Sequence, residues 1–213
     1  MKDWRLIYII FAKSEDKLYI SNKNRQAYFV LLSVCIIFVR INLKNCNVMF
    51  DKETYVQRRA LLKKNIGSGV LLFLGNDEQG LNYEDNAFRY RQDSTFLYYF
   101  GLSFAGLSAI IDIDEDKEII FGDELTIDHI VWMGTQPTLK EKSERVGIRE
   151  TLPSAAIISY LHKAVQKGQT VHYLPPYRPE HKLKLMDWRG IPPARQEGSV
   201  PFIRAVVAQR NYK

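Results

Sequence analysis

Residues 89–101 read RYRQDSTFLYYFG, a charged segment that passes without a break into an aromatic one. The alternation of its apolar side chains predicts a half-buried strand over Thr95–Phe100. Its two faces would carry Phe96, Tyr98 and Phe100 on one side and Leu97 and Tyr99 on the other. Polar residues collect immediately before this strand, at 85–93. Because loops held by a rigid sheet concentrate binding residues, the sequence predicts the first functional surface at 85–93.

The segments on either side of this stretch predict the rest of a sheet. Residues 69–75, GVLLFLG, form an apolar run between glycines, as expected of a strand that is buried on both faces. Residues 108–113 and 117–122 predict a hairpin around an acidic turn. Further strands are expected at 129–133 and 171–174.

Helices are predicted around these strands. The first would begin at Asp51 and end near Gly67, with an apolar stripe on one face and its cations on the other. The residues that carry this pattern are Tyr55, Val56, Arg59, Ala60, Leu62 and Lys63. Three more helices are expected at 139–146, 153–166 and 180–188. Strands mixed with helices in this order predict an α/β domain with a mixed sheet flanked by helices.

Composition and charge narrow the classes of function. The chain has 213 residues, of which 46% are hydrophobic and 25% charged, so it can form one large domain or one domain with an appendage. The net charge of +6 comes mainly from residues 1–48, which hold eight Lys/Arg and three Asp/Glu. Residues 49–213 hold the remaining 22 Lys/Arg and 21 Asp/Glu and are nearly neutral. Such a balanced domain lacks the clustered cations of a nucleic-acid surface, so no nucleic-acid partner is expected.

Both cysteines, Cys35 and Cys46, lie in the same leading segment. Residues 49–213 therefore contain neither a disulfide framework nor a thiolate metal site, which suits a reducing cytoplasm. We expect a cytoplasmic location.

Residues 1–48 are predicted to be a separate extension ahead of a domain at 49–213. Their apolar run, AYFVLLSVCIIFV at 27–39, would span about 20 Å as a helix, short of the roughly 30 Å hydrocarbon core of a membrane. A secretory signal fits the length of the run, but acidic residues precede it and no small-residue cleavage site follows. We favour a dispensable segment upstream of a natural start at Met49; a signal or anchor, and a genuine extra element, stay open. No membrane partner is expected for 49–213.

The acidic cluster and the histidines are the candidate catalytic residues of this chain. The densest acidic cluster lies at the predicted hairpin turn, where Asp and Glu are common for conformational reasons. It consists of Asp112, Asp114, Glu115 and Asp116. The histidines fall on separate predicted elements without a zinc-binding spacing, so they are expected at the surface or hydrogen-bonded in the core. They are His129, His162, His172 and His181.

Other catalytic motifs are also missing from residues 49–213. Gly67-Ser68-Gly69 precedes a strand and is a turn, whereas a phosphate-binding glycine loop follows a strand and opens a helix. No Gly-x-Ser-x-Gly nucleophile elbow occurs. The sequence therefore predicts no catalytic residue, no metal ligand and no self-sufficient active site in this chain.

Several segments, taken in order, resemble the amino-terminal domain of Xaa-Pro aminopeptidases (aminopeptidase P, of the creatinase/prolidase type). The resemblance covers most of residues 49–213. It rests on Arg58-Arg59-Ala60-Leu61-Leu62, the run Val70–Leu74, Tyr90-Arg91-Gln92-x-Ser94-x-Phe96, Gly101, Trp132-Met133-Gly134 and IRAVVAQR at 203–210.

The resemblance implies a ribonuclease-H-like domain that packs beside a carboxyl-terminal "pita-bread" catalytic domain in a homo-oligomer. The full family enzyme removes an amino-terminal residue that precedes proline and uses two manganese ions. Their Asp, His and Glu ligands belong to the catalytic domain and have no counterpart here, so this chain is expected to hold no cofactor and to be inactive alone. Its expected work is to wall the substrate cleft and to supply subunit contacts.

The resemblance also suggests four substrate-binding residues, two of them directed toward a neighbouring subunit. Asp85 would meet the cationic amino terminus of a peptide, and Trp132 would pack against its proline ring or a side chain. Arg91, in the polar loop, and Arg189, beside Trp188, complete the set. The structural alternatives are a helix or turn cap for Asp85 and a core or interface aromatic for Trp132.

Two other classes of function were considered. The first is a stand-alone binding or oligomerisation module with a ribonuclease-H-like fold, which dimerisation without metal would favour. The second is a ribonuclease-type enzyme, which needs a carboxylate cluster at the centre of the sheet, whereas the acidic cluster of this chain lies at a turn.

Overall fold

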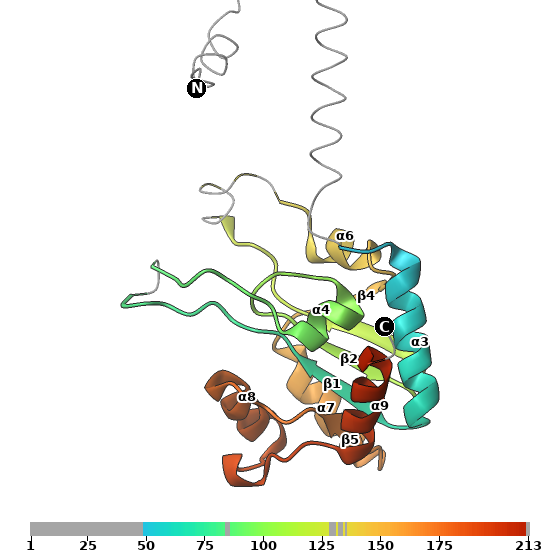
Figure 1. Cartoon of the computed structure of the whole chain (residues 1–213). Coiled ribbons are helices and arrows are strands. Elements are labelled where there is room, and N and C mark those ends of the chain that lie inside the picture. Colours follow the sequence, from blue (N-terminus) through green and yellow to red (C-terminus); the bar gives the residue numbers. More distant parts are fainter. Residues whose placement is uncertain (1–48, 84–85, 128–130, 132–133, 135, 212–213) are drawn as a thin grey trace, which may run out of the picture. The chain divides into compact units, whose positions relative to one another are not determined.

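The computed structural model describes residues 49–83, 86–127, 131, 134 and 136–211. Their core is a five-stranded mixed sheet with the strand order β4-β3-β2-β1-β5 (Figure 1). The strands are β1 (Val70–Leu74), β2 (Ser108–Asp112), β3 (Lys117–Phe121), β4 (Glu150–Leu152) and β5 (Val171–Tyr173). The pairs β1–β2 and β2–β3 are antiparallel, and β1–β5 and β3–β4 are parallel. The predicted mixed sheet is confirmed.

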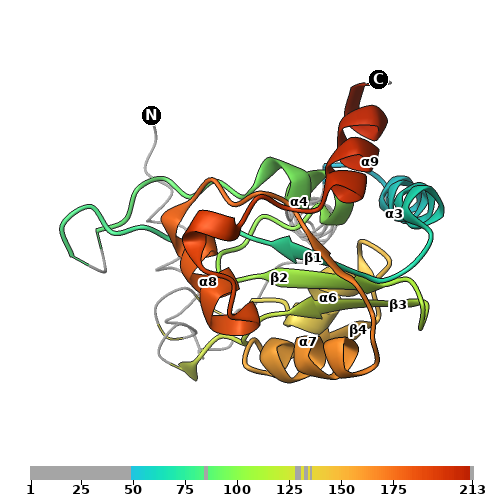
Figure 2. The same ribbon diagram turned by 90° about the horizontal axis from the view of Figure 1, so that it is seen from below.

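Helices cover both faces of the sheet (Figure 2). One face carries α3 (Lys52–Ile66), α4 (Ser94–Phe100) and α9 (Val200–Asn211), and the other carries α7 (Ala156–Gln166) and α8 (Pro179–Arg189). The short helices are α6 (Leu139–Glu144), which contacts β4, and the 3-10 turn η1 (Pro193–Arg195), which contacts α8. No helix in the described ranges is long and apolar enough to cross a membrane.

The apolar run of β1 is explained by this double cover. Leu71 and Phe73 belong to the cluster beneath α3, α4 and α9, whereas Val70 and Leu72 belong to the cluster beneath α7 and α8. Alternate residues of a strand point to opposite faces, so a strand between two helical layers must be apolar at every position. The prediction of a strand buried on both faces is correct.

The predicted strand at Thr95–Phe100 is wrong, because this segment is the helix α4. The Asp93 carboxylate caps the helix by accepting hydrogen bonds from the backbone N–H groups of Thr95 (2.8 Å) and Phe96 (2.9 Å). Gly101 ends it in a left-handed conformation with φ of 65°. A cap residue at one end and a glycine at the other are ordinary helix boundaries, and they override the alternation between them. The buried residues accordingly follow helical spacing, at Thr95, Phe96, Tyr99 and Phe100.

The predicted separation of apolar and cationic faces on the first helix is also wrong. Arg59 of α3 is fully buried. Its guanidinium donates to the Tyr99 carbonyl (2.9 Å), to the Val146 carbonyl (2.9 Å) and, through Nε, to the Glu118 carboxylate (2.7 Å). Burial lowers the pKa of Arg59, and the Glu118 charge offsets part of that effect. This arginine therefore joins α3 to the end of α4, the turn after α6 and strand β3.

Most remaining predictions differ from the structure only at element ends. The hairpin is confirmed, and its turn contains Asp116 with a positive φ of 50°. Asp112, however, is buried in β2 and accepts hydrogen bonds from Tyr160 (2.9 Å) and Gln169 (3.0 Å), so it is a structural carboxylate of the core. Strand β4 was not predicted. The expected strand at 129–133 lies, except for residue 131, outside the described residues.

Candidate functional site

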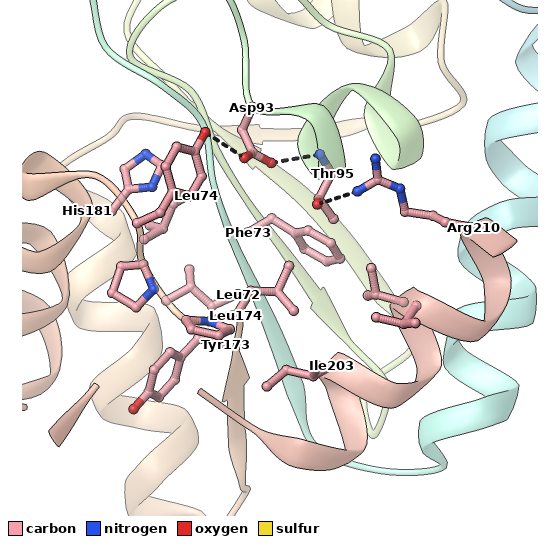
Figure 3. A pocket seen from close by; sticks show the side chains of 15 residues that line it. Leu72, Phe73, Leu74, Asp93, Thr95, Tyr173, Leu174, His181, Ile203 and Arg210 are labelled. Carbon is pink, nitrogen blue, oxygen red and sulfur yellow. Dashed lines mark hydrogen bonds between the residues drawn. The ribbon is translucent and has the colours of Figure 1, made fainter. Parts of the chain in front are cut away.

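A cavity of about 280 Å³ lies beside the carboxyl ends of β1 and β5 (Figure 3). Its floor is apolar and is formed by side chains of β1, of the segment after β5 and of α9. Polar side chains at its rim come from three places in the sequence: Asp93 before α4, Tyr177 and His181 just before and in the first turn of α8, and Arg210 near the end of α9. Parallel strands bring their carboxyl ends to one edge, which is a frequent location of binding sites in α/β sheets.

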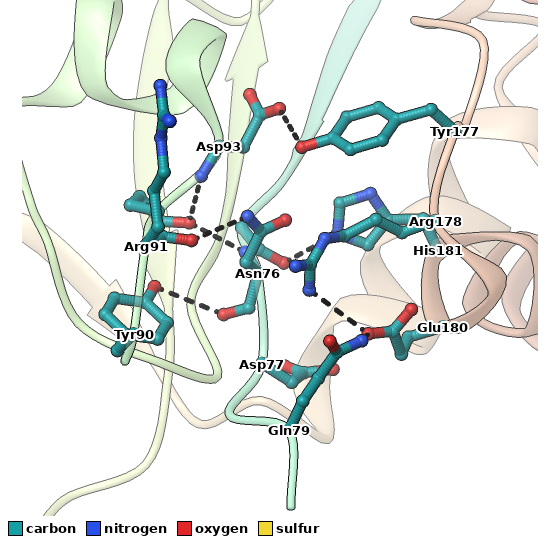
Figure 4. A network of polar contacts seen from close by, with 12 residues as sticks. Asn76, Asp77, Gln79, Tyr90, Arg91, Asp93, Tyr177, Arg178, Glu180 and His181 are labelled. Carbon is teal, nitrogen blue, oxygen red and sulfur yellow. Dashed lines mark hydrogen bonds and ion pairs between the residues drawn. The ribbon is translucent and has the colours of Figure 1, made fainter. Parts of the chain in front are cut away.

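A network of polar contacts lies next to this cavity, where the loop before α4 meets the segment after β1 (Figure 4). Gln92 is buried at its centre. Its Oε1 accepts hydrogen bonds from the backbone N–H groups of Asn76 (2.7 Å) and Asp93 (2.9 Å), and its Nε2 donates to the Phe104 carbonyl (2.8 Å). One side chain thus fixes the backbone of three segments.

Tyr90 belongs to the same network of hydrogen bonds. Its hydroxyl donates to the Phe104 carbonyl (2.6 Å), and burial, followed by the Asp77 charge, raises the pKa of Tyr90. The Asn76 side chain in turn donates to the Arg91 carbonyl (2.8 Å). The backbone of residues 90–93 is therefore held firmly, and the polar groups of Tyr90 and Gln92 serve the fold.

The start of α8 closes the network from the other side. His181 is buried, and its Nε2 donates to the Gly75 carbonyl (2.9 Å). Glu180 accepts hydrogen bonds from Gln79 and from Arg178. Burial raises the pKa of Glu180, but the hydrogen bonds from its own backbone and from Gln79, together with the Arg178 charge, lower it below its usual range. Glu180 is therefore ionised at neutral pH.

The four predicted binding residues are not brought together by any contact within the described residues. Arg91 lies on the rigid loop, and its side chain is exposed. Arg189 lies in the last turn of α8, where it is half-buried, and burial lowers its pKa. Asp85 and Trp132 lie outside the described residues. The loop is thus described at one predicted residue, Arg91.

One histidine and serine pair has the spacing of a nucleophile and its base. His172 Nδ1 lies 2.6 Å from Ser199 Oγ, and burial lowers the pKa of His172. His172 is buried in β5, and Ser199 accepts the first helical hydrogen bond of α9, from Ile203 N. The pair therefore holds the start of α9 against β5. His181 is hydrogen-bonded in the core and His162 is exposed, as predicted, whereas His129 lies outside the described residues.

No group of three or more His, Cys, Asp or Glu side chains in the described part of the chain is placed to hold a metal ion. The acidic turn residues are instead paired: Glu115 with Lys117 and Lys167, and Asp116 with Lys63. The described residues therefore do not fit the two-manganese site that the resemblance implies for a full enzyme.

Tyr177, His181 and Arg210 were not predicted as site residues. They lie more than 80 positions away from the polar loop in sequence, and no local pattern connects them. The Pro175-Pro176 pair, which follows β5, indicates that the chain turns there toward α8, but it does not indicate a binding site.

The family model described as the aminopeptidase P N-terminal domain matches residues 55–173. A probable Xaa-Pro aminopeptidase of Chaetomium globosum is 29% identical over 112 residues, which are 51% of this chain and 18% of that protein. A human Xaa-Pro dipeptidase is 33% identical over 76 residues, or 34% of this chain and 15% of that protein. The chain thus spans less than a fifth of the length of these two relatives.

Solved structures show the same fold. The Pseudomonas aeruginosa aminopeptidase PepP superposes with a TM-score of 0.57 at 21% identity, covering 71% of this chain and 35% of that one. The low-pH form of E. coli aminopeptidase P gives a TM-score of 0.55 at 18% identity, covering 65% and 32%. The sheet and its helical layers are therefore those found in aminopeptidases P.

Proposed function

Because the chain belongs to the aminopeptidase P N-terminal domain family, we propose that it is the accessory domain of a Xaa-Pro aminopeptidase. In this proposal it walls the substrate cleft of a catalytic domain and supplies contacts between subunits of a homo-oligomer. The substrates are peptides with proline at the second position. The supporting observation is the exposed Arg91 side chain on a loop whose backbone is held by Gln92 and Asn76. The fixed backbone sets the position from which the Arg91 guanidinium can reach an anionic group, and its planar donors suit a carboxylate.

The proposed roles of the other loop residues follow their chemistry. Asp85 pairs with the cationic amino terminus of a peptide, and Trp132 packs against its proline ring, in both cases at the active site of a neighbouring subunit. Arg189, in the last turn of α8, is the fourth substrate-binding residue of this proposal. Peptide hydrolysis itself requires the two manganese ions and their ligands from a catalytic domain, since the described residues offer no such set.

The first experiment is to sequence the source DNA beyond the codon for Lys213. An open frame that soon supplies the Asp, Asp, His, Glu, Glu ligand series supports the proposal. A stop codon with no such domain downstream contradicts it.

In the full-length enzyme, Arg91→Gln is expected to lower kcat/KM for a Xaa-Pro peptide by about tenfold, the value of one charge-assisted hydrogen bond. Arg195→Gln is the matched control, because Arg195 is also an exposed arginine and lies in η1. Equal kinetics for the two variants would remove Arg91 from the proposed site.

A second candidate function is a stand-alone binding or oligomerisation module with a ribonuclease-H-like fold. The observation in its favour is a group of exposed apolar side chains on the segment that connects β1 to α4. They are Leu81, Tyr83 and Phe88, each more than half exposed. Exposed apolar side chains gathered on one segment are typical of a protein interface. Sedimentation of the 213-residue chain without metal tests the oligomerisation form of this function: a dimer that Phe88→Ser converts to a monomer supports it, and a monomeric chain contradicts it.

A further inference from the structure

The cavity beside β1 has an apolar interior with charged groups only at its rim. Its floor and walls include Leu72, Leu74, Leu174, Ile203 and Val206. Its volume of about 280 Å³ lies just below the roughly 300–1,000 Å³ of typical ligand pockets. The space therefore suits a ligand smaller than a drug molecule, with a compact aliphatic part.

Two side-chain bridges cross the rim of this cavity (Figure 3). Tyr177 donates to Asp93 Oδ2 (3.1 Å), and Arg210 Nη1 donates to Thr95 Oγ1 (3.2 Å). Both bridges end on the loop and first turn of α4, whereas their donors come from the segment after β5 and from α9. Figure 3 shows Asp93 and Arg210 on either side of Thr95. A carboxylate and a guanidinium thus stand on the same rim.

Both charged groups retain capacity for a ligand. A guanidinium has five N–H donors, and Arg210, which is exposed, uses one of them in a hydrogen bond to a described residue. Asp93 Oδ1 serves as the cap of α4, but Oδ2 accepts from the exposed Tyr177 hydroxyl alone among the described residues. A carboxylate oxygen can accept a second hydrogen bond, and an exposed tyrosine can turn aside at small cost.

From this arrangement we propose that the cavity binds a free α-amino acid with an apolar side chain, such as leucine. The aliphatic side chain enters the cavity over Leu72 and Ile203. The ligand carboxylate pairs with Arg210, for which a two-pronged geometry is the most favourable, and the ligand ammonium group pairs with Asp93 Oδ2. Recognition of both charges on one α-carbon is what selects a free amino acid over an internal peptide segment. This binding does not depend on the function proposed above.

Binding is tested by NMR titration of the ¹⁵N-labelled 213-residue chain. L-leucine at millimolar concentration is expected to shift the amides of β1, the first turn of α4 and α9. Three comparison ligands each lack one feature: glycine lacks the side chain, N-acetyl-leucine the ammonium group and leucinamide the carboxylate. Each is expected to bind at least about tenfold more weakly: the two leucine derivatives because a hydrogen bond to a charged group is worth that factor or more, and glycine because it buries no aliphatic side chain.

Arg210→Gln is expected to weaken leucine binding by about 10- to 100-fold. Arg204→Gln is the matched control, because Arg204 is an exposed arginine of the same helix and does not line the cavity. Both variants should unfold within about 4 °C of the parent chain, because both side chains are exposed and Arg210→Gln removes one part-buried hydrogen bond. The proposal is overturned if leucine produces no shifts, if N-acetyl-leucine or leucinamide binds as well as leucine, or if the two variants bind leucine equally.

Discussion

Replacing Arg59 by methionine removes a buried cation but keeps an aliphatic stem of similar length. The variant leaves the carbonyl oxygens of Tyr99 and Val146 without their donor, and it leaves Glu118 without its nearest cation. A buried polar group that loses its partner costs about 1–3 kcal/mol, and a broken buried ion pair costs about 3–5 kcal/mol in total. We therefore expect Arg59→Met to lower the free energy of unfolding by about 3–5 kcal/mol.

The matched control is Lys63→Met, one turn further along α3. Lys63 also reaches Glu118, at 3.1 Å, but its side chain is partly exposed. Exposed ion pairs contribute about 0–1 kcal/mol, so this variant should stay within about 1 kcal/mol of the parent chain. Urea unfolding followed by circular dichroism measures both values, with an unchanged denaturant slope as the sign of two-state behaviour.

Two further variants keep the Arg59 prediction testable if the methionine variant does not fold. Arg59→Lys retains the charge beside Glu118 but cannot hold three acceptors in a fork, so its loss should be intermediate. After Arg59→Met the Glu118 carboxylate keeps only the partly exposed Lys63 as its cation, so adding Glu118→Gln should recover about 1 kcal/mol. The reasoning fails if Arg59→Met costs no more than Lys63→Met, because the three hydrogen bonds of Arg59 would then carry no net stability.

Gly101→Ala is expected to cost about 2–5 kcal/mol, because the glycine has a positive φ and an added Cβ would lie 2.3 Å from an aromatic carbon of α3. Gly168→Ala, with a similar φ of 81° but open space around it, should cost only about 1–2 kcal/mol by the same urea titration. Asp93→Ala should lower the free energy of unfolding by about 1–2 kcal/mol, because it removes two capping hydrogen bonds. Asp51→Ala removes no such bond and should change it by less than about 0.5 kcal/mol. Equal losses in the two variants would contradict the capping role of Asp93. Burial lowers the pKa of His181 in the folded chain below the value of 6.5 that it has in the unfolded chain. Between the folded and the unfolded pKa, the unfolded chain therefore binds more protons than the folded chain. The free energy of unfolding should therefore fall between pH 7 and pH 5, and His181→Gln should flatten that fall; an unchanged slope would contradict it.

The strands were predictable where their burial left a local mark. The run Val70–Leu74 must be apolar throughout because helices cover both sides of it, and this is visible in the sequence. Strand β4, at Glu150–Leu152, has three residues and a polar composition. It forms because the edge of β3 offers parallel hydrogen bonds to it. The local sequence of three residues contains no signal of that edge, so β4 could not be predicted.

The helix α4 shows where the prediction failed although the signal was present. In STFLYYF every position after Thr95 is apolar or aromatic, so a period of two and a period of 3.6 fit it equally well. The deciding residues stand outside the run. Asp93 supplies the cap and Gly101 the left-handed end, and together they limit the segment to two helical turns.

The Tyr90-Arg91-Gln92 motif joins fold and function in an unexpected way. Read as sequence, its polar residues suggest a binding loop. In the structure, Gln92 and Tyr90 direct their hydrogen bonds into the protein, toward Asn76 and Phe104, and only Arg91 of the three is exposed. The motif therefore mainly links neighbouring segments of the fold, and its presence in a sequence predicts the fold more directly than it predicts a binding site. A chain could keep these hydrogen bonds and lose peptide binding, so experiments on the proposed peptide contact should be directed at Arg91, whose side chain is exposed.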